Sequence, residues 1–295
     1  MPCYHPITGY RSKTVNENGK RPIVFNRNEG YIDMPVEVPC GRCIGCRLER
    51  SKQWAIRCVQ EAKMHEKNCF ITLTYDQEHL PKDGSLDVTH YQKFMKRLRK
   101  HFNNKKVRYF HCGEYGEKLS RPHYHACLFG VDFDDKKLWS VRNNNKLYRS
   151  ETLEKLWTFG YSTIGEVTFE SAAYIARYVT KKINGDMAED HYKGKKPEYI
   201  TMSRRPGIGH DWFTKYIKDV YPNDFVMIRN NIKTKPSRYY DKLLEKKSED
   251  DILTIKAKRK RRARESEHNS SHRLKAREKC KLAQTKNLKR SYENA

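Results

Sequence analysis

The stretch LSRPHYHACLFG, residues 119–130, decides the expected fold because it places two histidines within a β-strand pattern. Side chains at positions i and i+2 of a strand point to the same face of a sheet. His123 and His125 are therefore expected to project side by side, and the apolar residues after them continue the strand. Residues 106–116, KVRYFHCGEYG, form a second strand pattern just upstream. The two strands predict a hairpin that brings Glu114 close to both histidines.

Two imidazoles and one carboxylate on neighbouring strands form a ligand set for a divalent cation. Mixed nitrogen and oxygen ligation suits Mn²⁺ and, with lower affinity, Mg²⁺. A site with three protein ligands leaves coordination positions for substrate oxygens. We therefore expect His123, His125 and Glu114 to hold Mg²⁺ or Mn²⁺. The alternative is two partly exposed polar histidines with no metal, which a single His-x-His pattern does not exclude.

The segments around this hairpin predict an α+β fold. Strand patterns occur at 69–76 and 161–168, and helix patterns at 48–66, 87–102, 153–157 and 170–183, with a polar insertion that includes RNNNK at 142–146. From residue 69 onward the order is β-α-β-β-α-β-α, which fits a ferredoxin-like or RRM-like antiparallel sheet with the His-x-His strand at its centre.

The helix predicted at 170–183, ESAAYIARYVTKKI, carries two tyrosines. Tyr174 and Tyr178 are four residues apart and so share one helical face, with Lys181 nearly in line and Lys182 slightly off it. A tyrosine hydroxyl has a pKa near ~10 and needs a neighbouring lysine or a metal-polarised phosphate to act as a nucleophile. The alternative is that both rings are core or groove aromatics.

The charge balance of the 295-residue chain indicates a polyanionic partner. It has 61 Lys and Arg against 36 Asp and Glu, a formal net charge of +25. Nucleic acid is the first candidate, and an anionic membrane surface is the weaker one. No stretch approaches the roughly 20 apolar residues of a membrane span, and the first residues lack the apolar region of a signal peptide. We therefore expect a cytosolic protein.

Nine cysteines, an odd number, argue against a disulfide framework in such a protein. Cys40, Cys43 and Cys46 form the run CGRCIGC, which supplies three thiolates where structural zinc usually takes four ligands. Cys3 is the best fourth ligand, with His5 and Cys58 as rivals. An iron–sulfur cluster also fits three closely spaced cysteines. Buried small residues or reactive thiols with no metal remain a further alternative.

These features divide the chain into three expected parts. Residues 1–50 form a Cys-rich metal-binding module, residues 51–230 the domain with the sheet, and residues 231–295 a basic tail, partly disordered or helical. The tail includes KAKRKRRARE at 256–265, which cannot bury enough apolar surface to fold alone. It is expected to clamp DNA without sequence preference, or else to be a solvated run of charge.

Several motifs together resemble a known family. PHYHACLFG followed by YIARYVTKK is similar to the His-hydrophobic-His endonucleases that initiate rolling-circle replication. VPCGRCIGCRLERSKQWAIR, FITLTYD, GEYGEKLSRPHYHACLFG and TMSRRPGIG more closely resemble the replication initiators of microviruses, in the gokushovirus branch. The resemblance covers roughly residues 38–215.

The resemblance implies that His123 and His125 hold a metal against the scissile phosphate, with Glu114 as the third ligand. It implies that Tyr174 and Tyr178 are nucleophiles, which form a 5′-phosphotyrosine and leave a 3′-OH primer, and that Lys181 or Lys182 assists them. We also expect DNA contacts from four arginines: Arg121, Arg177, Arg204 and Arg205.

The implied partners are single- and double-stranded origin DNA in the cytoplasm of an infected bacterium, with neither a membrane nor a small-molecule substrate. The chain lacks the G-x-x-x-x-G-K-[ST] loop of a helicase, so a host helicase and a host DNA polymerase are expected.

Two other functions compete with this one. A nonenzymatic RRM-like protein would stack bases on Tyr109, Tyr124 and Phe129. A plasmid relaxase shares the chemistry but usually has three histidine ligands, and no third histidine lies nearby in the sequence.

Overall fold

The computed structural model describes residues 3–103, 105–116, 119–142, 145–181, 187–228, 231–264 and 270–286. They form two compact units: a smaller one from residues up to Arg50 and from Lys256 onward, and a larger one that includes Ser51–Ile255. The predicted domain boundaries at residues 50 and 230 stay predictions. None of the described helices is long and apolar enough to cross a membrane.

The smaller unit contains a three-stranded sheet in the order β2-β1-β3. Its elements are β1 (Ile7–Ser12), β2 (Ile23–Val24), the 3-10 turn η1 (Arg27–Glu29) and β3 (Gly30–Val38). The helix α9 (Ser271–Lys286) belongs to the same unit. In the antiparallel pair of β1 and β3, Ile7 lies opposite Val38. The residues just before β1 and just after β3 therefore lie at the same end of this sheet.

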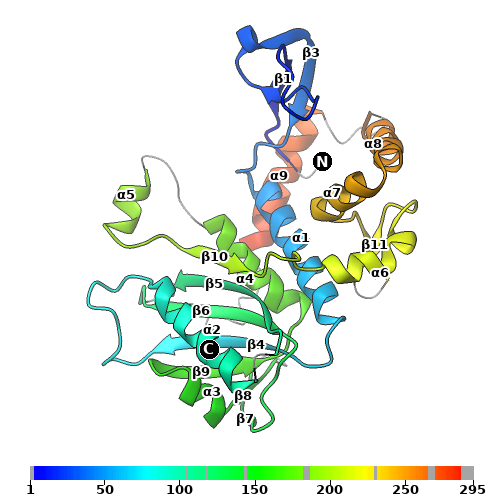
Figure 1. Cartoon of the computed structure of the whole chain (residues 1–295). Coiled ribbons are helices and arrows are strands. Elements are labelled where there is room, and N and C mark those ends of the chain that lie inside the picture. Colours follow the sequence, from blue (N-terminus) through cyan, green and yellow to red (C-terminus); the bar gives the residue numbers. More distant parts are fainter. Residues whose placement is uncertain are drawn as a thin grey trace. The chain divides into compact units, whose positions relative to one another are not determined.

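The larger unit is built on an antiparallel sheet of seven strands in the order β10-β5-β6-β4-β9-β8-β7 (Figure 1). The strands are β4 (Asn68–Tyr75), β5 (Arg108–Tyr115), β6 (Pro122–Phe129), β7 (Lys137–Arg142), β8 (Asn145–Arg149), β9 (Gly160–Gly165) and β10 (Tyr199–Met202). The expected α+β class with a large antiparallel sheet is confirmed. Within the predicted polar insertion, β7 and β8 pair as antiparallel strands, which the sequence analysis did not predict.

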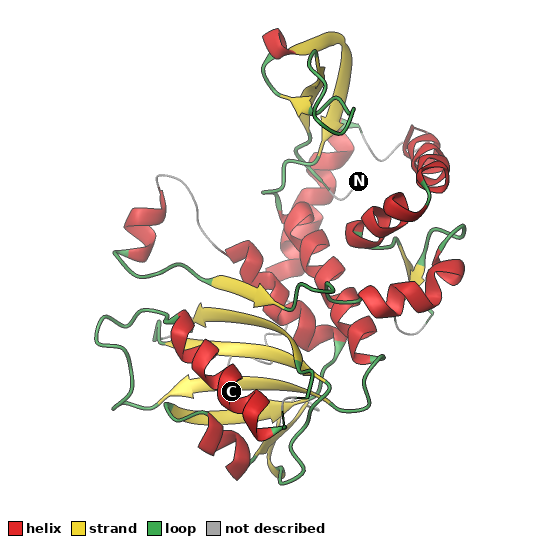
Figure 2. Ribbon diagram, viewed as in Figure 1, coloured by secondary structure: helices red, strands yellow, loops and turns green. Residues whose placement is uncertain are grey.

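Helices cover both faces of this sheet (Figure 2). On one face, α2 (Val88–His101) and α3 (Glu151–Leu156) pack on alternate residues of β4 and β6, such as Leu73 and Tyr124. On the other, α1 (Ile44–Ala62) and α4 (Phe169–Lys181) pack on residues such as Phe70 and Cys127. Because successive side chains alternate, each strand contributes to two separate apolar clusters.

A third apolar cluster lies beside α1 and includes residues beyond 230. It joins α6 (His210–Val220), α7 (Arg238–Lys247) and the start of α8 (Glu249–Arg264). Tyr240 and Ile252 are completely buried there, and the Tyr240 hydroxyl donates a hydrogen bond to Gln60 Oε1 at 2.5 Å.

The larger unit also contains three short elements: α5 (Met187–Tyr192), β11 (Val226–Met227) and β12 (Lys233–Thr234).

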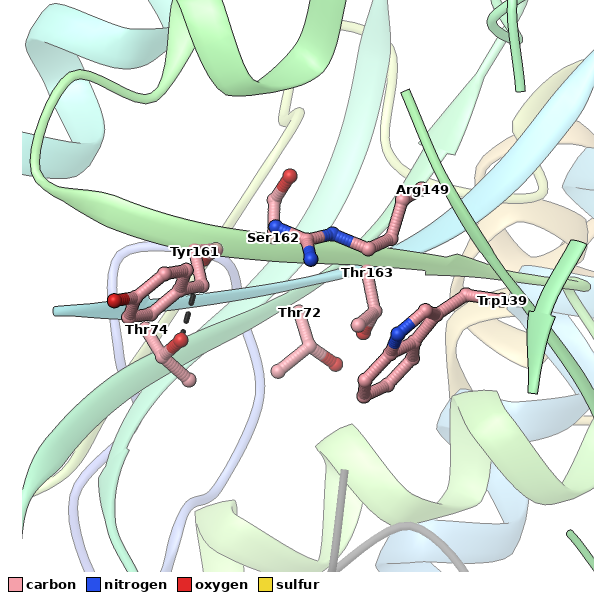
Figure 3. A pocket seen from close by; sticks show the side chains of 7 residues that line it. All are labelled: Thr72, Thr74, Trp139, Arg149, Tyr161, Ser162 and Thr163. Carbon is pink, nitrogen blue, oxygen red and sulfur yellow. Dashed lines mark hydrogen bonds between the residues drawn. The ribbon is translucent and has the colours of Figure 1, made fainter. Parts of the chain in front are cut away.

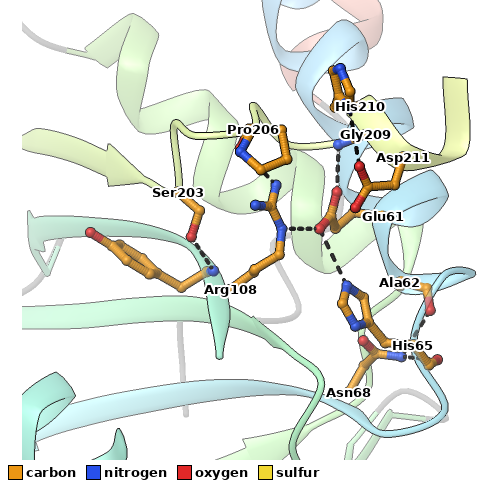
Figure 4. A network of polar contacts seen from close by, with 11 residues as sticks. Glu61, Ala62, His65, Asn68, Arg108, Ser203, Pro206, Gly209, His210 and Asp211 are labelled. Atoms are coloured by element: carbon orange, nitrogen blue, oxygen red, sulfur yellow. Dashed lines mark hydrogen bonds and ion pairs between the residues drawn. The ribbon is translucent and has the colours of Figure 1, made fainter. Parts of the chain in front are cut away.

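A buried ion pair connects α1, β5 and the loop after β10 (Figure 4). Arg108 donates to Glu61 Oε1 and, at 3.0 Å, to the carbonyl oxygen of Pro206. Glu61 Oε2 accepts a hydrogen bond from the backbone N–H of Gly209 at 2.6 Å. Burial raises the pKa of Glu61, but hydrogen bonds from His65, Arg108 and Gly209 outweigh this effect and lower it. The network fixes the backbone of the TMSRRPGIG segment.

We expect Arg108→Ala to lower the free energy of unfolding by about 3–5 kcal/mol, because it leaves the Glu61 carboxylate buried without its cation. Urea unfolding followed by circular dichroism measures this change. Lys67→Ala is the matched control, since its ion pair with Asp134 is fully exposed and should contribute little. Equal losses in the two variants would contradict a structural role for the buried pair.

Candidate active site and metal centres

The register of three strands assembles a polar cluster on the α4 side of the sheet. Glu114 of β5 lies opposite His123 of β6, and Thr72 of β4 lies opposite His125 on the other side of β6. These side chains share one face because each strand alternates. Tyr174 of α4 is directed at the same cluster, since its hydroxyl donates to Glu114.

One oxygen atom lies at the centre of this cluster. Glu114 Oε1 is 2.7 Å from His123 Nε2 and 2.8 Å from His125 Nε2, and it accepts the hydrogen bond of the Tyr174 hydroxyl at 2.9 Å. Residues that are 60 positions apart in the sequence thus meet at one carboxylate. The structure brings together four of the residues that the sequence analysis selected for the site.

Burial and charge set the protonation of this cluster. Only 1% of Glu114 is exposed. Burial raises the pKa of its carboxyl group, but when the imidazoles are protonated, the charge of His125 and hydrogen bonds from both rings outweigh burial and hold the pKa at about 2. Burial lowers the pKa of His125, which favours its neutral form. The cluster therefore presents an ionised carboxylate at neutral pH.

The hydrogen bonds of the two histidines fit a bound cation. His123 Nδ1 lies 3.1 Å from the carbonyl oxygen of Arg121, which can only accept. Nδ1 therefore carries a proton, and in neutral His123 the Nε2 lone pair faces the carboxylate. His123 Nε2 and Glu114 Oε1 would then be two acceptors only 2.7 Å apart, and they repel each other. A proton or a metal ion bound to both atoms removes this repulsion.

Two further observations support the same fit. Glu114 Oε2 is buried and has no hydrogen-bond partner among the described residues. The three ligand atoms of Glu114, His123 and His125 lie within 4.8 Å of one another. Thr72 Oγ1, at 2.9 Å from His125 Nδ1, orients the second imidazole. The sequence analysis missed Thr72, although its place in the alternating FITLTYD strand was a usable signal.

The other predicted catalytic residues lie on or after α4. Tyr178 follows Tyr174 by about one helical turn and Lys181 ends the helix, but their side chains are outside the described part of the structure, as is all of Lys182. Arg177 lies beside the cluster, with its guanidinium carbon 5.4 Å from the centre of the Tyr174 ring.

The remaining predicted DNA-contact residues lie in two places. Arg121 precedes β6, and its guanidinium donates to the carbonyl oxygens of Tyr75 and Asp76 at 3.1 and 3.2 Å. Arg204 and Arg205 are exposed in the turn after β10, in the loop that the Glu61 network fixes.

The second cluster consists of Cys3, Cys40, Cys43 and Cys46 in the smaller unit. All four sulfur atoms lie within 4.8 Å of one another. Cys3 Sγ is 3.7 Å from Cys40 Sγ and 4.0 Å from Cys43 Sγ. Four sulfurs bound at ~2.3 Å to one tetrahedral zinc ion are roughly 3.8 Å apart. The observed spacing therefore fits a zinc site.

The strand pairing explains why Cys3 is the fourth member. Ile7 pairs with Val38, so the chain ends that carry Cys3 and Cys40 meet. The two rivals lie elsewhere: His5 Nε2 is 2.6 Å from Glu278 Oε2, and Cys58 is buried against the large sheet. Among the described residues, each unit holds one group of metal-ligand type.

Electrostatics favour a thiolate at Cys43. Burial raises its pKa, but hydrogen bonds from the backbone N–H groups of Tyr4 and Cys46 outweigh it and lower the pKa to about 6. A low pKa supplies the deprotonated sulfur that zinc requires.

Comparisons with known proteins place the chain in a family. A family model described as replication-associated protein ORF2/G2P matches residues 68–183, which include both the ligand strands and α4. Over 251 residues the chain is 37% identical to replication-associated protein ORF2 of Spiroplasma virus 4, covering 80% of this chain and 76% of that protein. Over 274 residues it is 34% identical to replication-associated protein VP4 of Bdellovibrio phage phiMH2K, covering 90% and 84%.

A third relative is replication-associated protein ORF4 of Chlamydia phage 1, which is 33% identical over 226 residues, covering 71% of this chain and 54% of that protein. No solved structure matches the chain. All three relatives come from gokushoviruses. The chain therefore belongs to the replication-associated proteins of the microviruses, in the gokushovirus branch.

Proposed function

We propose that this protein initiates rolling-circle replication of a phage genome by nicking origin DNA through a tyrosine. The observation that carries the proposal is the meeting of Tyr174, His123 and His125 at one carboxylate oxygen of Glu114. A nucleophile of this kind and a group of cation ligands within hydrogen-bond distance are what phosphoryl transfer requires.

In the proposed reaction, the tyrosine oxygen attacks the scissile phosphorus. A phosphorus–oxygen bond to tyrosine forms and the bond to the 3′ oxygen breaks, which leaves a 5′-phosphotyrosine and a 3′-OH primer. The Tyr174 hydroxyl, oriented before attack by its hydrogen bond to Glu114 Oε1, gives up its proton to solvent, and the leaving 3′ oxygen takes up a proton from water. Bound Mg²⁺ or Mn²⁺, held by His123, His125 and Glu114, would polarise the phosphate as a Lewis acid.

The proposed reaction cycle explains why the protein would need two tyrosine nucleophiles. Each transfer exchanges one phosphodiester for another, so no nucleotide cofactor is required. After one round of copying the first tyrosine still holds the 5′ end of the displaced strand. A second hydroxyl, that of Tyr178, cleaves the regenerated origin while the first bond is resealed into a single-stranded circle. Lys181 or Lys182 would stabilise the attacking oxygen.

The fold supports the same proposal. The strand order β5-β6-β4-β9, with α2 after β4 and α3 before β9, is the order of a ferredoxin-like sheet. We propose that Arg121, Arg177, Arg204 and Arg205 contact single- and double-stranded origin DNA, and that a host helicase and polymerase act with the protein in the infected cell's cytoplasm.

The nonenzymatic RRM-like alternative loses support in the structure. Tyr124 and Phe129, two of its three stacking residues, are completely buried. Tyr124 lies under α2 and Phe129 packs in the cluster with α1 and α4, so neither presents a ring to a base. These two assignments are therefore wrong.

The proposed nicking is tested by incubating the protein with supercoiled DNA that carries the phage origin, in the presence of Mn²⁺. Nicked circles with protein on the 5′ end are the expected product, and the protein-linked end gives the nick sequence. Unchanged supercoiled DNA, despite binding, would favour a nonenzymatic role.

We further propose that the four-cysteine cluster holds one structural zinc ion. Purified protein should contain about one zinc per chain, and Cys43→Ser should lose it together with thermal stability, because metal binding contributes to folding. Elemental analysis and thermal melting measure both effects. Cys280→Ser, which changes an exposed thiol, is the matched control. Iron in place of zinc would indicate an iron–sulfur cluster, and the absence of both metals would contradict the assignment.

A further inference from the structure

A cavity of about 230 Å³ lies on the same face of the sheet as the His pair, over β4 and β9. Figure 3 shows its lining side chains: Thr72, Thr74, Trp139, Arg149, Tyr161, Ser162 and Thr163. α4 packs over β5, β6 and β10 on this face, so the opening lies on the part toward the β7–β8 edge.

Two exposed aromatic rings border the cavity. In Figure 3, Trp139 and Tyr161 stand on opposite sides of Thr72 and Thr163. Trp139 is 48% exposed and Tyr161 is 59% exposed, a large apolar area to leave in water. Such exposure of large aromatic side chains beside a cavity marks a binding surface.

The backbone at Trp139 is irregular. The pairing of β7 with β8 shifts register between Leu138 and Ser140, so Trp139 is the extra residue of a β-bulge. A bulge redirects a side chain relative to the regular alternation, and bulges are frequent next to active sites. This feature directs Trp139 toward the cavity from the edge strand.

A fixed cation accompanies the rings. Arg149 on β8 is held by Glu154, whose Oε1 is 2.8 Å from Arg149 Nε and 2.6 Å from Nη2. The guanidinium carbon lies 5.9 Å from the centre of the Trp139 ring. Lys137, which lies opposite Arg149 in the pairing of β7 with β8, is exposed on the same face. Aromatic rings beside two cations, Arg149 and Lys137, have the composition of a surface that binds single-stranded nucleic acid.

The cavity is directly connected to the candidate active site. Thr72 lines the cavity and its hydroxyl contacts His125 Nδ1 at 2.9 Å. Thr74, also in the lining, lies opposite His123 in the pairing of β4 with β6. A group bound in the cavity would therefore be a close neighbour of a phosphate held at the His pair.

We propose that this cavity, named here the Trp139 pocket, binds one unpaired nucleobase of single-stranded DNA, stacked on Trp139 and adjacent to the scissile phosphate. The proposal rests on the proposed nicking function for the identity of that phosphate. Threonine hydroxyls at the floor can hydrogen-bond a base edge, and Arg149 and Lys137 lie on the same face, where they can contact the phosphate backbone. A stacked base would fix the position of the strand without reading a duplex, whose bases are already stacked.

The test measures binding of a fluorescein-labelled 15-nucleotide oligo(dT) to the full chain by anisotropy, without added divalent metal, at several salt concentrations. Trp139→Ala should weaken binding about 5- to 150-fold, the range that corresponds to loss of one base–aromatic stack. Trp139→Phe keeps a ring and should stay close to wild type. Stacking releases no counterions, so the slope of log K against log salt should stay unchanged in both variants.

Leu138→Ala is the matched control, because this neighbour is also exposed on β7 but does not line the cavity. Its affinity should equal that of the wild type, and a 15-base-pair duplex should bind all variants equally. Melting temperatures check that each variant is folded. Wild-type oligonucleotide affinity of Trp139→Ala, or an equal loss in Leu138→Ala, would overturn the proposal.

This binding assay is independent of nicking. A Trp139-dependent affinity without any nicking of origin DNA would support the pocket and contradict the proposed reaction. Nicking together with unchanged binding by Trp139→Ala would support the reaction and contradict the pocket.

Discussion

A chain that carries both Tyr174→Phe and Tyr178→Phe is expected to form no covalent adduct with origin DNA. Only two hydroxyl groups are removed, so the fold should be retained, and Glu114 Oε1 keeps both imidazole partners. Adducts are measured as protein that migrates with radiolabelled DNA in denaturing gels. The expected change is complete loss, the largest effect that the mechanism predicts.

The single Phe variants separate the two hydroxyls. Each should still cleave some origin DNA and form an adduct, and an unequal loss would identify the tyrosine that initiates. Each should be worse at releasing a closed circle than at making the first nick, because release needs a second free tyrosine. If the two rings were only core aromatics, phenylalanine would replace them with little effect on either step.

Tyr91→Phe provides the control for removing a tyrosine hydroxyl. Tyr91 is buried and its hydroxyl has no hydrogen-bond partner among the described residues, so adduct formation should be unaffected. Peptide mapping of the wild-type adduct then decides the assignment. Recovery of DNA on a residue outside 174–178 would end the two-tyrosine mechanism.

Replacement of either metal-ligand histidine is expected to lower nicking by at least about 100-fold. Loss of a residue that merely orients a metal ligand already costs 10- to 100-fold in affinity or activity. Binding to origin DNA should survive in His123→Ala and in His125→Ala, since basic residues carry most of the affinity. Glu114→Ala should impair nicking less, because a water molecule can replace one ligand.

His101→Ala is the matched control, since His101 is exposed at the end of α2 and belongs to neither cluster. Its nicking rate should equal that of the wild type. Full nicking by the double variant of His123 and His125 would contradict the metal assignment, because no other group of metal-ligand type was found near them in the described structure.

The sequence predicted those parts of the fold that have a strong local period. The strand before α2, the hairpin of β5 and β6, and α2 itself lie within a few residues of the expected ranges. The predicted helix at 87–102 has apolar residues at helical spacing, and four of them form the buried face of α2: Tyr91, Phe94, Met95 and Leu98. The meeting of Glu114 with His123 followed from the same local pattern, because a short hairpin determines its own register.

The sequence could not predict features that depend on distant partners. Spacing alone did not choose among Cys3, His5 and Cys58, since the choice is made by the pairing of β1 with β3. Tyr240 and Ile252 lie in the segment predicted as a basic tail from its composition, and both are buried in the third cluster through partners on α6 and α7 that are distant from Ile252 in sequence. The bulge at Trp139 lies in the pairing of β7 with β8. The sequence analysis did not predict these two strands, because it interpreted the segment that includes RNNNK as a polar insertion.

Because side chains alternate along β6, each position in this strand faces one of the two sides of the sheet. His123 and His125 point to the ligand face. The core under α2 is filled by the residues that point to the other face: Tyr124, Ala126 and Leu128. Deleting a single residue inside β6 would reverse the facing of the residues on one side of the deletion, so that ligand-face residues would point into the apolar core or core residues to the ligand face. Activity and folding would be lost together.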